Sequence, residues 1–247
     1  MPGGVLAVFA HPDDESLLAG GALAACAAAG RRVAIVSMTR GERGPGRRSD
    51  LGDVREAELE AAARALGAAA AECLDYPDGE LANADAEEAA GELGRLLERE
   101  RPETLITFSE EGLYWHPDHL AVSRLLGTAL ELVEPAPRWV YGATWPDRHA
   151  ARLVALMSAR GLATDLWGLE PDAFGAPEGS ITISVDVTPF LPAKLAALRA
   201  YASQIGPGHL LSALPDDVAD EFLGREYFVR LRPEQAKEDW LAKEASA

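Results

Sequence analysis

The sequence contains few cysteines and no long hydrophobic run. It has 247 residues and only two cysteines, Cys26 and Cys73. Two isolated cysteines make neither a disulfide framework nor a Cys-x-x-Cys metal site, and both stand in apolar contexts that favour burial. No apolar window is long enough to span a membrane, and no basic segment precedes an apolar one at the N-terminus. We therefore expect a cytoplasmic protein without a membrane span.

Basic residues are also scarce. The chain has 23 lysines and arginines against 40 aspartates and glutamates, which gives a formal net charge of −17. Such a charge argues against a polyanion such as DNA or RNA as the main partner. The phosphate-loop pattern Gly-x4-Gly-Lys-Ser/Thr and the nucleophile-elbow pattern Gly-x-Ser-x-Gly do not occur. The pair Gly20-Gly21 lies inside a predicted helix and does not have the spacing of a dinucleotide-binding fingerprint.

Hydrophobic residues make up 48% of the chain, which is enough for a sizeable core. In the first half, short apolar runs alternate with segments typical of helices. The alternation predicts a mostly parallel sheet with helices on both faces, a Rossmann-like three-layer sandwich of strand order 3-2-1-4-5. The predicted strands are Val5–Phe9, Arg32–Met38, Ala70–Leu74 and Thr104–Phe108, and the predicted helices are Leu17–Ala29, Val54–Leu66, Ala84–Arg99 and about Leu120–Leu132.

The second half is less regular, and we expect it to extend the sheet with further strands and helices. No linker separates two domains, so we predict one domain over residues 1–247, with a core at 1–135 that carries the site and a part at 136–247 that completes the sheet and pocket. The expected strands are Trp139–Ala143, Ser180–Val187 and Arg225–Leu231. The expected helices are Arg148–Ala159, Pro192–Ser203 and Pro233–Ala245, and the expected loops are Gly161–Gly179 and Pro207–Asp217.

Residues suited to catalysis follow the first and fourth predicted strands. The segment His11-Pro12-Asp13-Asp14 comes directly after the first, and the segment from Tyr114 to His119 comes after the fourth. With strand order 3-2-1-4, the ligand crevice of an open sheet lies between these two strands. Three of the five histidines therefore fall in the two loops that the topology brings together.

Two histidines and one carboxylate, with a position left for water, are typical of a catalytic zinc site. The candidates outnumber the ligands needed, and the surplus can supply a base and a group that stabilises an oxyanion. Each segment alone is equally well explained as a helix start, with Asp13 or Asp14 as the N-cap. Their joint occurrence at the switch point favours the site. The candidates are His11, Asp13, Asp14, Glu15, His116, Asp118 and His119.

With these two segments, the sequence resembles the PIG-L/LmbE-like family of zinc-dependent N-deacetylases. The resemblance is carried by the segment Ala10 to Glu15 together with His116-Pro117-Asp118-His119. Other matching segments are Thr39-Arg40-Gly41-Glu42, Val54 to Leu59, Leu66-Gly67, Tyr76-Pro77-Asp78-Gly79, Lys194-Leu195 and Tyr201-Ala202-Ser203-Gln204. The match covers residues 1–130 well and 180–230 weakly.

The resemblance implies a role for each matching residue. His11, Asp14 and His119 would bind one Zn²⁺, and Asp13 would be the general base. His116 would be a protonated partner that stabilises the oxyanion or donates to the leaving amine, with Asp118 orienting it. Tyr114 would assist at the carbonyl. The residues that would meet the sugar are Arg55, Asp78 and Glu42.

The implied activity is hydrolysis that removes the acetyl group from the N-acetylglucosamine of a small glycoconjugate, such as a bacillithiol- or mycothiol-type precursor. Residues 161–179 show no family pattern, which leaves the substrate open. Two alternatives remain: a two-histidine, one-carboxylate iron enzyme, and a sugar-binding member of the fold without catalysis. Homo-oligomers occur in the family, and Trp139, Trp145 and Trp167 are interface candidates, although we favour a place in the core or pocket wall.

Overall fold

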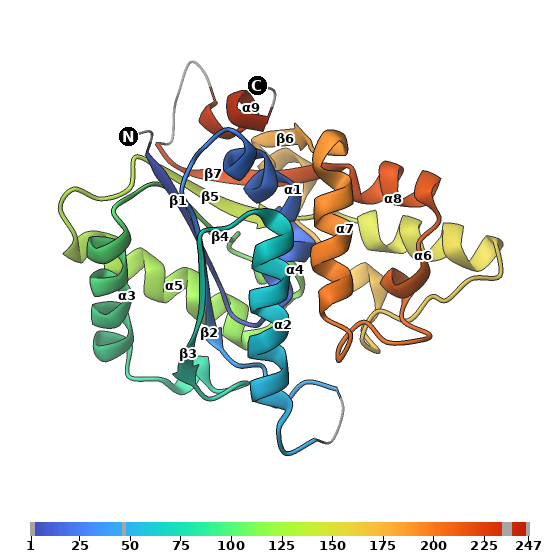
Figure 1. Ribbon diagram of the computed structural model, residues 1–247, viewed down its shortest axis with the longest axis horizontal. Coiled ribbons are helices and arrows are strands. Elements are labelled where there is room, and N and C mark those ends of the chain that lie inside the picture. The colour runs from blue at the N-terminus through green and yellow to red at the C-terminus, as the bar shows by residue number, and fades with distance from the viewer. Residues whose placement is uncertain (1–2, 46–47, 234–238, 246–247) are drawn as a thin grey trace.

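A seven-stranded sheet between two layers of helices forms the framework of the protein (Figure 1). The computed structural model describes residues 3–45, 48–233 and 239–245. The strand order is β3-β2-β1-β4-β5-β7-β6, which confirms the predicted Rossmann-like order over its first five strands. Strands β1 to β5 are parallel, and β7 runs antiparallel to both β5 and β6. The strands are β1 (Gly4–Phe9), β2 (Val33–Thr39), β3 (Ala70–Tyr76), β4 (Pro102–Phe108), β5 (Trp139–Thr144), β6 (Ile183–Asp186) and β7 (Arg225–Arg232).

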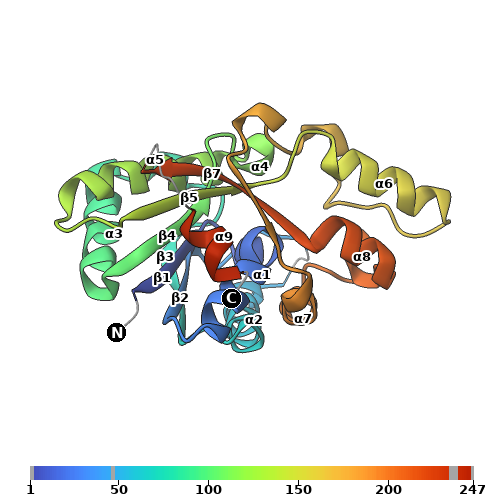
Figure 2. The same ribbon diagram turned by 90° about the horizontal axis from the view of Figure 1, so that it is seen from above.

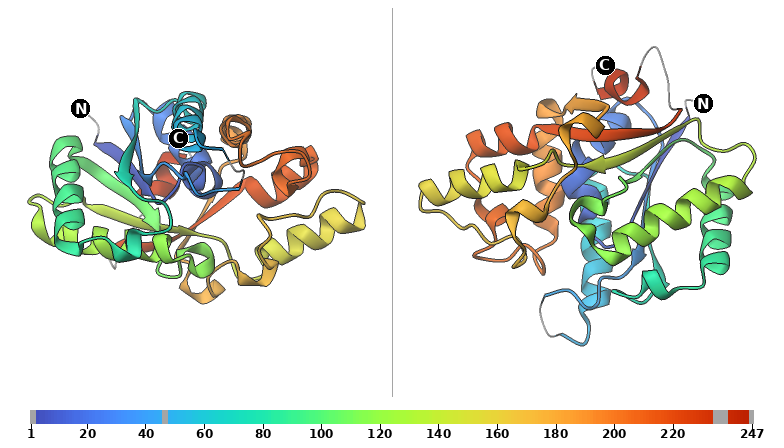
Figure 3. Two further views of the ribbon diagram at one scale, coloured as in Figure 1. Left: turned by 90° about the horizontal axis from the view of Figure 1, so that it is seen from below. Right: turned by 180° about the vertical axis from the view of Figure 1, so that it is seen from behind.

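The helices divide between the two faces of the sheet, as Figure 2 shows. One layer holds α1 (Asp14–Ala28), α2 (Leu51–Leu66) and α7 (Leu191–Ala200), which contact one another. The other layer holds α3 (Ala86–Glu100) and α5 (Pro117–Leu132). Beyond the sheet, the views agree in placing two further helices together at one end of the molecule (Figures 1 and 3). These are α6 (His149–Ala159) and α8 (Asp216–Leu223); α9 (Trp240–Ala245) packs against α1 and β6.

The central strands are buried on both faces, as expected for a parallel sheet covered by helices. Every residue of β2 is buried, and so is every residue of β1 after Gly4. At the carboxyl ends of β1 and β4, the rings of Phe9 and Phe108 meet edge to face with centroids 4.9 Å apart. The last strand in the sheet, β6, alternates buried and exposed residues, which confirms the exposed side predicted for it. The two loops that carry the candidate residues therefore begin at strands that are packed on both faces of the sheet.

The structure corrects several predictions for the second half. Helix α8 was not predicted, because its first residues fall in the expected loop Pro207–Asp217; its buried residues Val218, Ala219, Phe222 and Leu223 do follow a helical period. The helix expected at 192–203 ends at Ala200, so residues 201–203 leave it. The terminal helix was expected at 233–245, and the structure has a helix at Trp240–Ala245. Residues 234–238 lie outside the described residues.

The remaining expectations about burial hold with one exception. Cys26 is buried, but Cys73 is only half-buried, because β3 is an edge strand of the sheet; both thiols are free. Trp139 and Trp145 lie in the core. Over the residues that the structure describes, no helix combines the length and the apolar character needed to cross a membrane.

Candidate active site and metal centre

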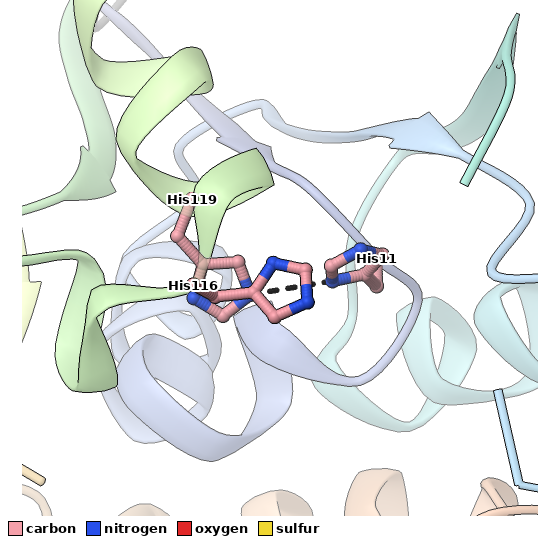
Figure 4. A group of neighbouring side chains, drawn as sticks. All are labelled: His11, His116 and His119. Carbon is pink, nitrogen blue, oxygen red and sulfur yellow. Dashed lines mark hydrogen bonds between the residues drawn. The ribbon is translucent and has the colours of Figure 1, made fainter. Parts of the chain in front are cut away.

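The loops after β1 and β4 meet at the carboxyl edge of the sheet, as the topology predicts. His11 follows β1, and Asp14 is the first residue of α1. His119 lies in the first turn of α5, and all three side chains are buried. Figure 4 shows the imidazoles of His116 and His119 facing His11 from the opposite loop, with a dashed line between His119 and His11.

The side chains of His11, Asp14 and His119 form a triangle, called the donor triangle below, to which Asp14 contributes a different oxygen on each of its two edges. His11 Nδ1 lies 3.2 Å from His119 Nε2 and 3.4 Å from Asp14 Oδ2. His119 Nε2 lies 3.5 Å from Asp14 Oδ1. Four ligands placed tetrahedrally about 2.0–2.1 Å from a zinc ion stand about 3.4 Å apart. The two nitrogens are therefore spaced as two ligands of such an ion would be, and each has one Asp14 oxygen at a similar distance.

The outer nitrogen of each of these histidines has an acceptor. His119 Nδ1 lies 2.8 Å from the carbonyl oxygen of Gly112. His11 Nε2 lies 3.1 Å from Asp78 Oδ1 and 3.3 Å from Asp118 Oδ2. Since an outer nitrogen that donates a proton leaves the inner nitrogen with a lone pair, these contacts leave the inner nitrogens available to bind a metal ion.

With one ligand atom taken from each residue, two groups of atoms in the described part of the chain lie within 4.8 Å of one another: those of His11, His116 and His119, and those of His11, Asp78 and Asp118. The second group needs His11 Nε2 as a ligand, but the oxygens of Asp118 also accept the backbone N–H groups of Gly79 and Leu81, at 2.7 and 3.0 Å. That carboxylate is better described as an anchor for the 79–81 turn and for the outer face of His11. The set His11, Asp14 and His119 remains the one that the resemblance implies, and it differs from the three-histidine group by having Asp14 in place of His116.

Gly112 makes the approach of His119 possible. Its φ is +57°, a left-handed conformation that glycine adopts without strain. A Cβ atom at this position would lie 2.7 Å from the Cβ of His119. The close contact allows the Gly112 carbonyl to hold the histidine ring.

Asp13 lies beside the cluster in a strained backbone conformation. Its φ is 121°, and it precedes α1 without capping it by a side-chain hydrogen bond, so the helix-cap alternative is wrong for this residue. Arg55 donates to Asp13 Oδ2 over 3.0 Å, while Oδ1 has no partner among the described residues. Burial raises the pKa of Asp13 to about 7, and the guanidinium of Arg55 opposes that rise. A carboxyl group of this pKa is suited to general base catalysis.

The cluster favours a positive charge at its centre. Burial opposes a proton on His11, yet hydrogen bonds with Asp118, Asp14 and Asp78 hold its pKa well above the ordinary value. Burial also opposes ionisation of Asp14, but the neighbouring histidines lower its pKa to about 2. Burial lowers the pKa of His119 to about 4, which keeps this ring neutral. A divalent cation would replace the proton of His11 in this acidic surrounding.

His116 and Tyr114 come from the segment between β4 and α5. His116 is the N-cap of α5, where its Nδ1 accepts the backbone N–H of Asp118 over 3.2 Å. The contact from Asp118 to His116 is thus made by the Asp118 backbone N–H, while the Asp118 carboxylate bonds to the 79–81 turn. Burial lowers the pKa of His116, whereas the resemblance implied a protonated ring. Tyr114 packs against His119 with ring centroids 5.0 Å apart, and within the described chain its hydroxyl has no hydrogen-bond partner.

A cavity of about 340 Å³ opens over the cluster. Arg55 and Asp78, both predicted to meet the sugar, line it, whereas Glu42 does not. The exposed Glu42 instead accepts the backbone N–H of Asp78 over 2.8 Å and so supports the 77–79 turn. Two larger cavities, of about 680 and 590 Å³, lie beside β6 and beside α5 and are not lined by any of the cluster residues.

Sequence reasoning missed part of the cavity wall, which the second half supplies. Trp167 and Leu169 come from the irregular 161–179 segment, and Gln204 follows α7. An isolated backbone β-bridge between Asp165 and His209 holds the 161–179 segment. The ring centroids of Trp167 and His209 lie 4.4 Å apart. Trp167 agrees with the place in the core or pocket wall that we favoured for it, and Gln204 ends the matching Tyr-Ala-Ser-Gln segment, whereas Leu169 had no signal in the sequence.

Fold and site together define a Rossmann-like α/β protein with a two-histidine, one-carboxylate cluster and a neighbouring carboxylate at the switch point of its sheet. A family model described as PIG-L, GlcNAc-PI de-N-acetylase, matches residues 6–130. The 1D-myo-inositol 2-acetamido-2-deoxy-alpha-D-glucopyranoside deacetylase of Acidothermus cellulolyticus is 34% identical over 92% of this chain and 88% of its own length. The chain therefore belongs to the PIG-L family.

Solved structures share the fold over nearly the whole chain. The conserved protein TT1542 of Thermus thermophilus is 26% identical, with a TM-score of 0.66 over 96% of this chain and 98% of its own. The 4-carboxy-2-hydroxymuconate hydratase of Pseudomonas putida is 24% identical, with the same TM-score of 0.66 over 96% of this chain and 99% of its own. The second likeness concerns the fold alone, because one fold supports different reactions.

Proposed function

We propose that this protein is a zinc-dependent hydrolase that removes the acetyl group from the N-acetylglucosamine moiety of a small glycoconjugate. The observation that carries the proposal is the donor triangle of His11, Asp14 and His119, whose edges are 3.2–3.5 Å when each nitrogen is paired with its nearer Asp14 oxygen, with His11 and Asp14 lining the same cavity as Asp13. The identity of 34% to a deacetylase of an acetamido-sugar joined to inositol supports this substrate class. A bacillithiol- or mycothiol-type precursor has this chemistry.

His11, Asp14 and His119 would hold the zinc ion. A zinc ion bound there lowers the pKa of a water ligand to near neutral and polarises a carbonyl group. The chain's own contribution begins with Asp13, whose Oδ1 is free to accept a proton from the attacking water while Arg55 holds Oδ2. Water adds to the acetamide carbonyl, the proton taken by Asp13 passes to the nitrogen as the carbon–nitrogen bond breaks, and acetate and the free amine leave.

The opposite wall of the cavity would serve the carbonyl oxygen and the amine. Tyr114 and His116 both line the cavity, and the free hydroxyl of Tyr114 can donate a hydrogen bond to the oxyanion. His116 keeps its Nδ1 on the helix backbone, which leaves Nε2 for the substrate. Arg55 and Asp78 would bind the sugar hydroxyls, and Glu42 would act by holding the Asp78 turn.

The direct test is acetate release from a panel of N-acetylglucosaminyl compounds that carry inositol, malate or a second sugar. Purified protein is assayed together with a determination of its bound metal. We expect release from at least one compound and one zinc ion per chain. Protein that holds zinc and binds a panel compound without releasing acetate would support the non-catalytic alternative instead.

Asp13→Ala tests the base. Turnover is expected to fall by about 10² or more while the metal remains bound, because general base catalysis contributes about that factor. Near-normal deacetylation by this variant would remove Asp13 from the mechanism.

The iron alternative has its own test. Protein purified without oxygen is analysed for iron and zinc and then assayed for oxygen consumption. Iron at stoichiometric occupancy together with oxygen consumption would overturn the hydrolytic proposal, whereas acetate release by the zinc-loaded form without oxygen consumption supports it.

A further inference from the structure

The segment that follows α7 reaches the backbone of Asp13 through one buried carboxylate. Tyr201 is the C-cap of α7, and its side chain is fully buried. Its hydroxyl donates to Glu15 Oε1 over 2.6 Å across a sequence separation of 186 residues. Glu15 is 1% exposed and also accepts the Ser16 hydroxyl on Oε1 over 2.5 Å.

The other oxygen of Glu15 holds the candidate base. Glu15 Oε2 accepts the backbone N–H of Asp13 over 3.2 Å. Asp13 has a φ of 121°, which non-glycine residues rarely adopt and which costs free energy unless neighbouring contacts fix it. Arg55 fixes the side chain of Asp13, and Glu15 fixes its main chain.

We propose that Tyr201 is a positioning residue: through Glu15 it holds the strained backbone of Asp13 and so keeps the Asp13 carboxylate beside the metal-binding cluster. Tyr201 does not line the cavity, so it acts without touching the substrate. Burial keeps its pKa far above neutral, so the hydroxyl stays a donor. The inference rests on the proposed function for its effect on turnover, but the contact itself can be measured independently.

A structural role alone would be the competing explanation, because Tyr201 also fills the core between α1 and α7. Tyr201→Phe keeps the ring and removes only the hydroxyl, which leaves this packing intact. A matched control exists in Tyr141 on β5, which is also fully buried and donates its hydroxyl to Asp239 over 3.2 Å. Tyr141→Phe removes a comparable tyrosine–carboxylate hydrogen bond that has no path to Asp13.

The experiment compares wild type, Tyr201→Phe and Tyr141→Phe by three measurements: kcat and KM for acetate release, zinc content, and hydrogen exchange of the Asp13 amide by NMR after selective ¹⁵N-aspartate labelling. For Tyr201→Phe we expect kcat to fall about 10- to 100-fold, the range for loss of a supporting hydrogen bond. We expect KM within about twofold, full zinc content, and exchange of the Asp13 amide at least about tenfold faster. Tyr141→Phe should leave all of these at the wild-type values.

A double variant shows whether the effect passes through Glu15. If Tyr201 acts through that carboxylate, adding Tyr201→Phe to Glu15→Gln lowers kcat far less than Tyr201→Phe does alone, because coupled residues are not additive. Equal losses in both backgrounds overturn the proposal. So does an unchanged Asp13 amide in Tyr201→Phe, whatever the activity. A wild type that releases no acetate defeats the proposed function, while the exchange measurement still decides the contact.

Discussion

The two halves of the chain contribute to the site in different ways. Residues 4–132 supply all three side chains of the donor triangle, and their atoms come from a strand end or a helix start on the most buried part of the sheet. Residues 139–245 supply none of these atoms but provide part of the cavity wall and the contact to Glu15. A metal site in general tolerates errors of only a few tenths of an ångström and is best carried by rigid elements, whereas loop segments that line a cavity can vary without loss of the fold.

Two buried histidines, one in each half, make the comparison concrete. Burial lowers the pKa of both His119 and His149 to about 4. The outer nitrogen of His119, Nδ1, contacts the carbonyl oxygen of Gly112. Its inner nitrogen, Nε2, faces His11 Nδ1 and Asp14 Oδ1. His149 donates from Nε2 to the carbonyl of Phe222 over 3.0 Å and packs between Trp145 and Phe222. The same residue in the same charge state is thus a ligand candidate in one half and core packing in the other.

The largest expected effect comes from replacing these two histidines. His119→Ala removes one of three proposed protein ligands, so we expect zinc content to fall to near zero and turnover to fall more than about hundredfold. His149→Ala should lower the free energy of unfolding by about 1–3 kcal/mol and leave zinc content unchanged. Metal analysis and denaturant unfolding check both. Full zinc occupancy in His119→Ala would show that His119 is not a ligand. The two histidines would then no longer differ in their role.

The second prediction concerns the support of His119. Gly112→Ala places a Cβ against His119 and strains a left-handed backbone, so we expect zinc affinity to fall about 10- to 100-fold, measured by competition with a chelator. The control is Gly161→Ala in the second half, where φ is also positive, at +67°, and the added Cβ would meet nothing within 4 Å. That variant should lose stability and keep its zinc affinity. Equal affinities in the two variants would show that Gly112 does not hold the ligand.

The first half was predictable because its chemistry follows from local patterns. Apolar runs with helical segments between them fix a parallel sheet, and the strand order then forces His11 and His119 together without knowledge of any contact. The role of Asp118 was not predictable, because its carboxylate bonds to the backbone of the 79–81 turn rather than to a neighbour in sequence. Glu42 was assigned to the sugar for the same reason: its partner is the N–H of Asp78, 36 residues away.

The second half resisted prediction because its positions are set by tertiary contacts. Trp167 has a positive φ of 53° and lies in a segment with little regular structure, so no period marks it as cavity wall. Tyr201 continues the helical spacing of the buried residues of α7, but the helix ends one residue before it. Its ring packs into the core and its hydroxyl donates to Glu15. Periodicity reports which side of an element is buried, and it says nothing of which distant carboxylate a buried hydroxyl meets.

The third prediction concerns the loss of folding stability in acid that the buried His149 causes. The folded-state pKa of about 4 lies below the ordinary value of 6.5, because burial, helped by the charges of Arg152 and Lys194, disfavours the protonated ring. The unfolded chain therefore takes up a proton first as the pH falls below about 6.5, and stability is lost until about pH 4. At pH 5 this residue should cost about 2 kcal/mol relative to pH 8.

The variant His149→Gln can keep a donor for the Phe222 carbonyl but cannot titrate. Its free energy of unfolding should fall less than that of the wild type between pH 8 and pH 5, by about 2 kcal/mol. Urea unfolding at both pH values measures the difference. Parallel losses in the two proteins would mean that His149 is not the buried neutral group assigned here.

The smallest expected effect falls on the cavity wall. Trp167→Ala removes an aromatic surface that lines the cavity without touching the donor triangle, so we expect KM to rise about 3- to 10-fold with kcat nearly unchanged, the pattern for loss of uniform binding. Trp115→Ala is the control, because Trp115 is 66% exposed and does not line the cavity. A fall in kcat without a change in KM would place Trp167 in the chemistry, and the second half would then contribute more than cavity wall and support to the site.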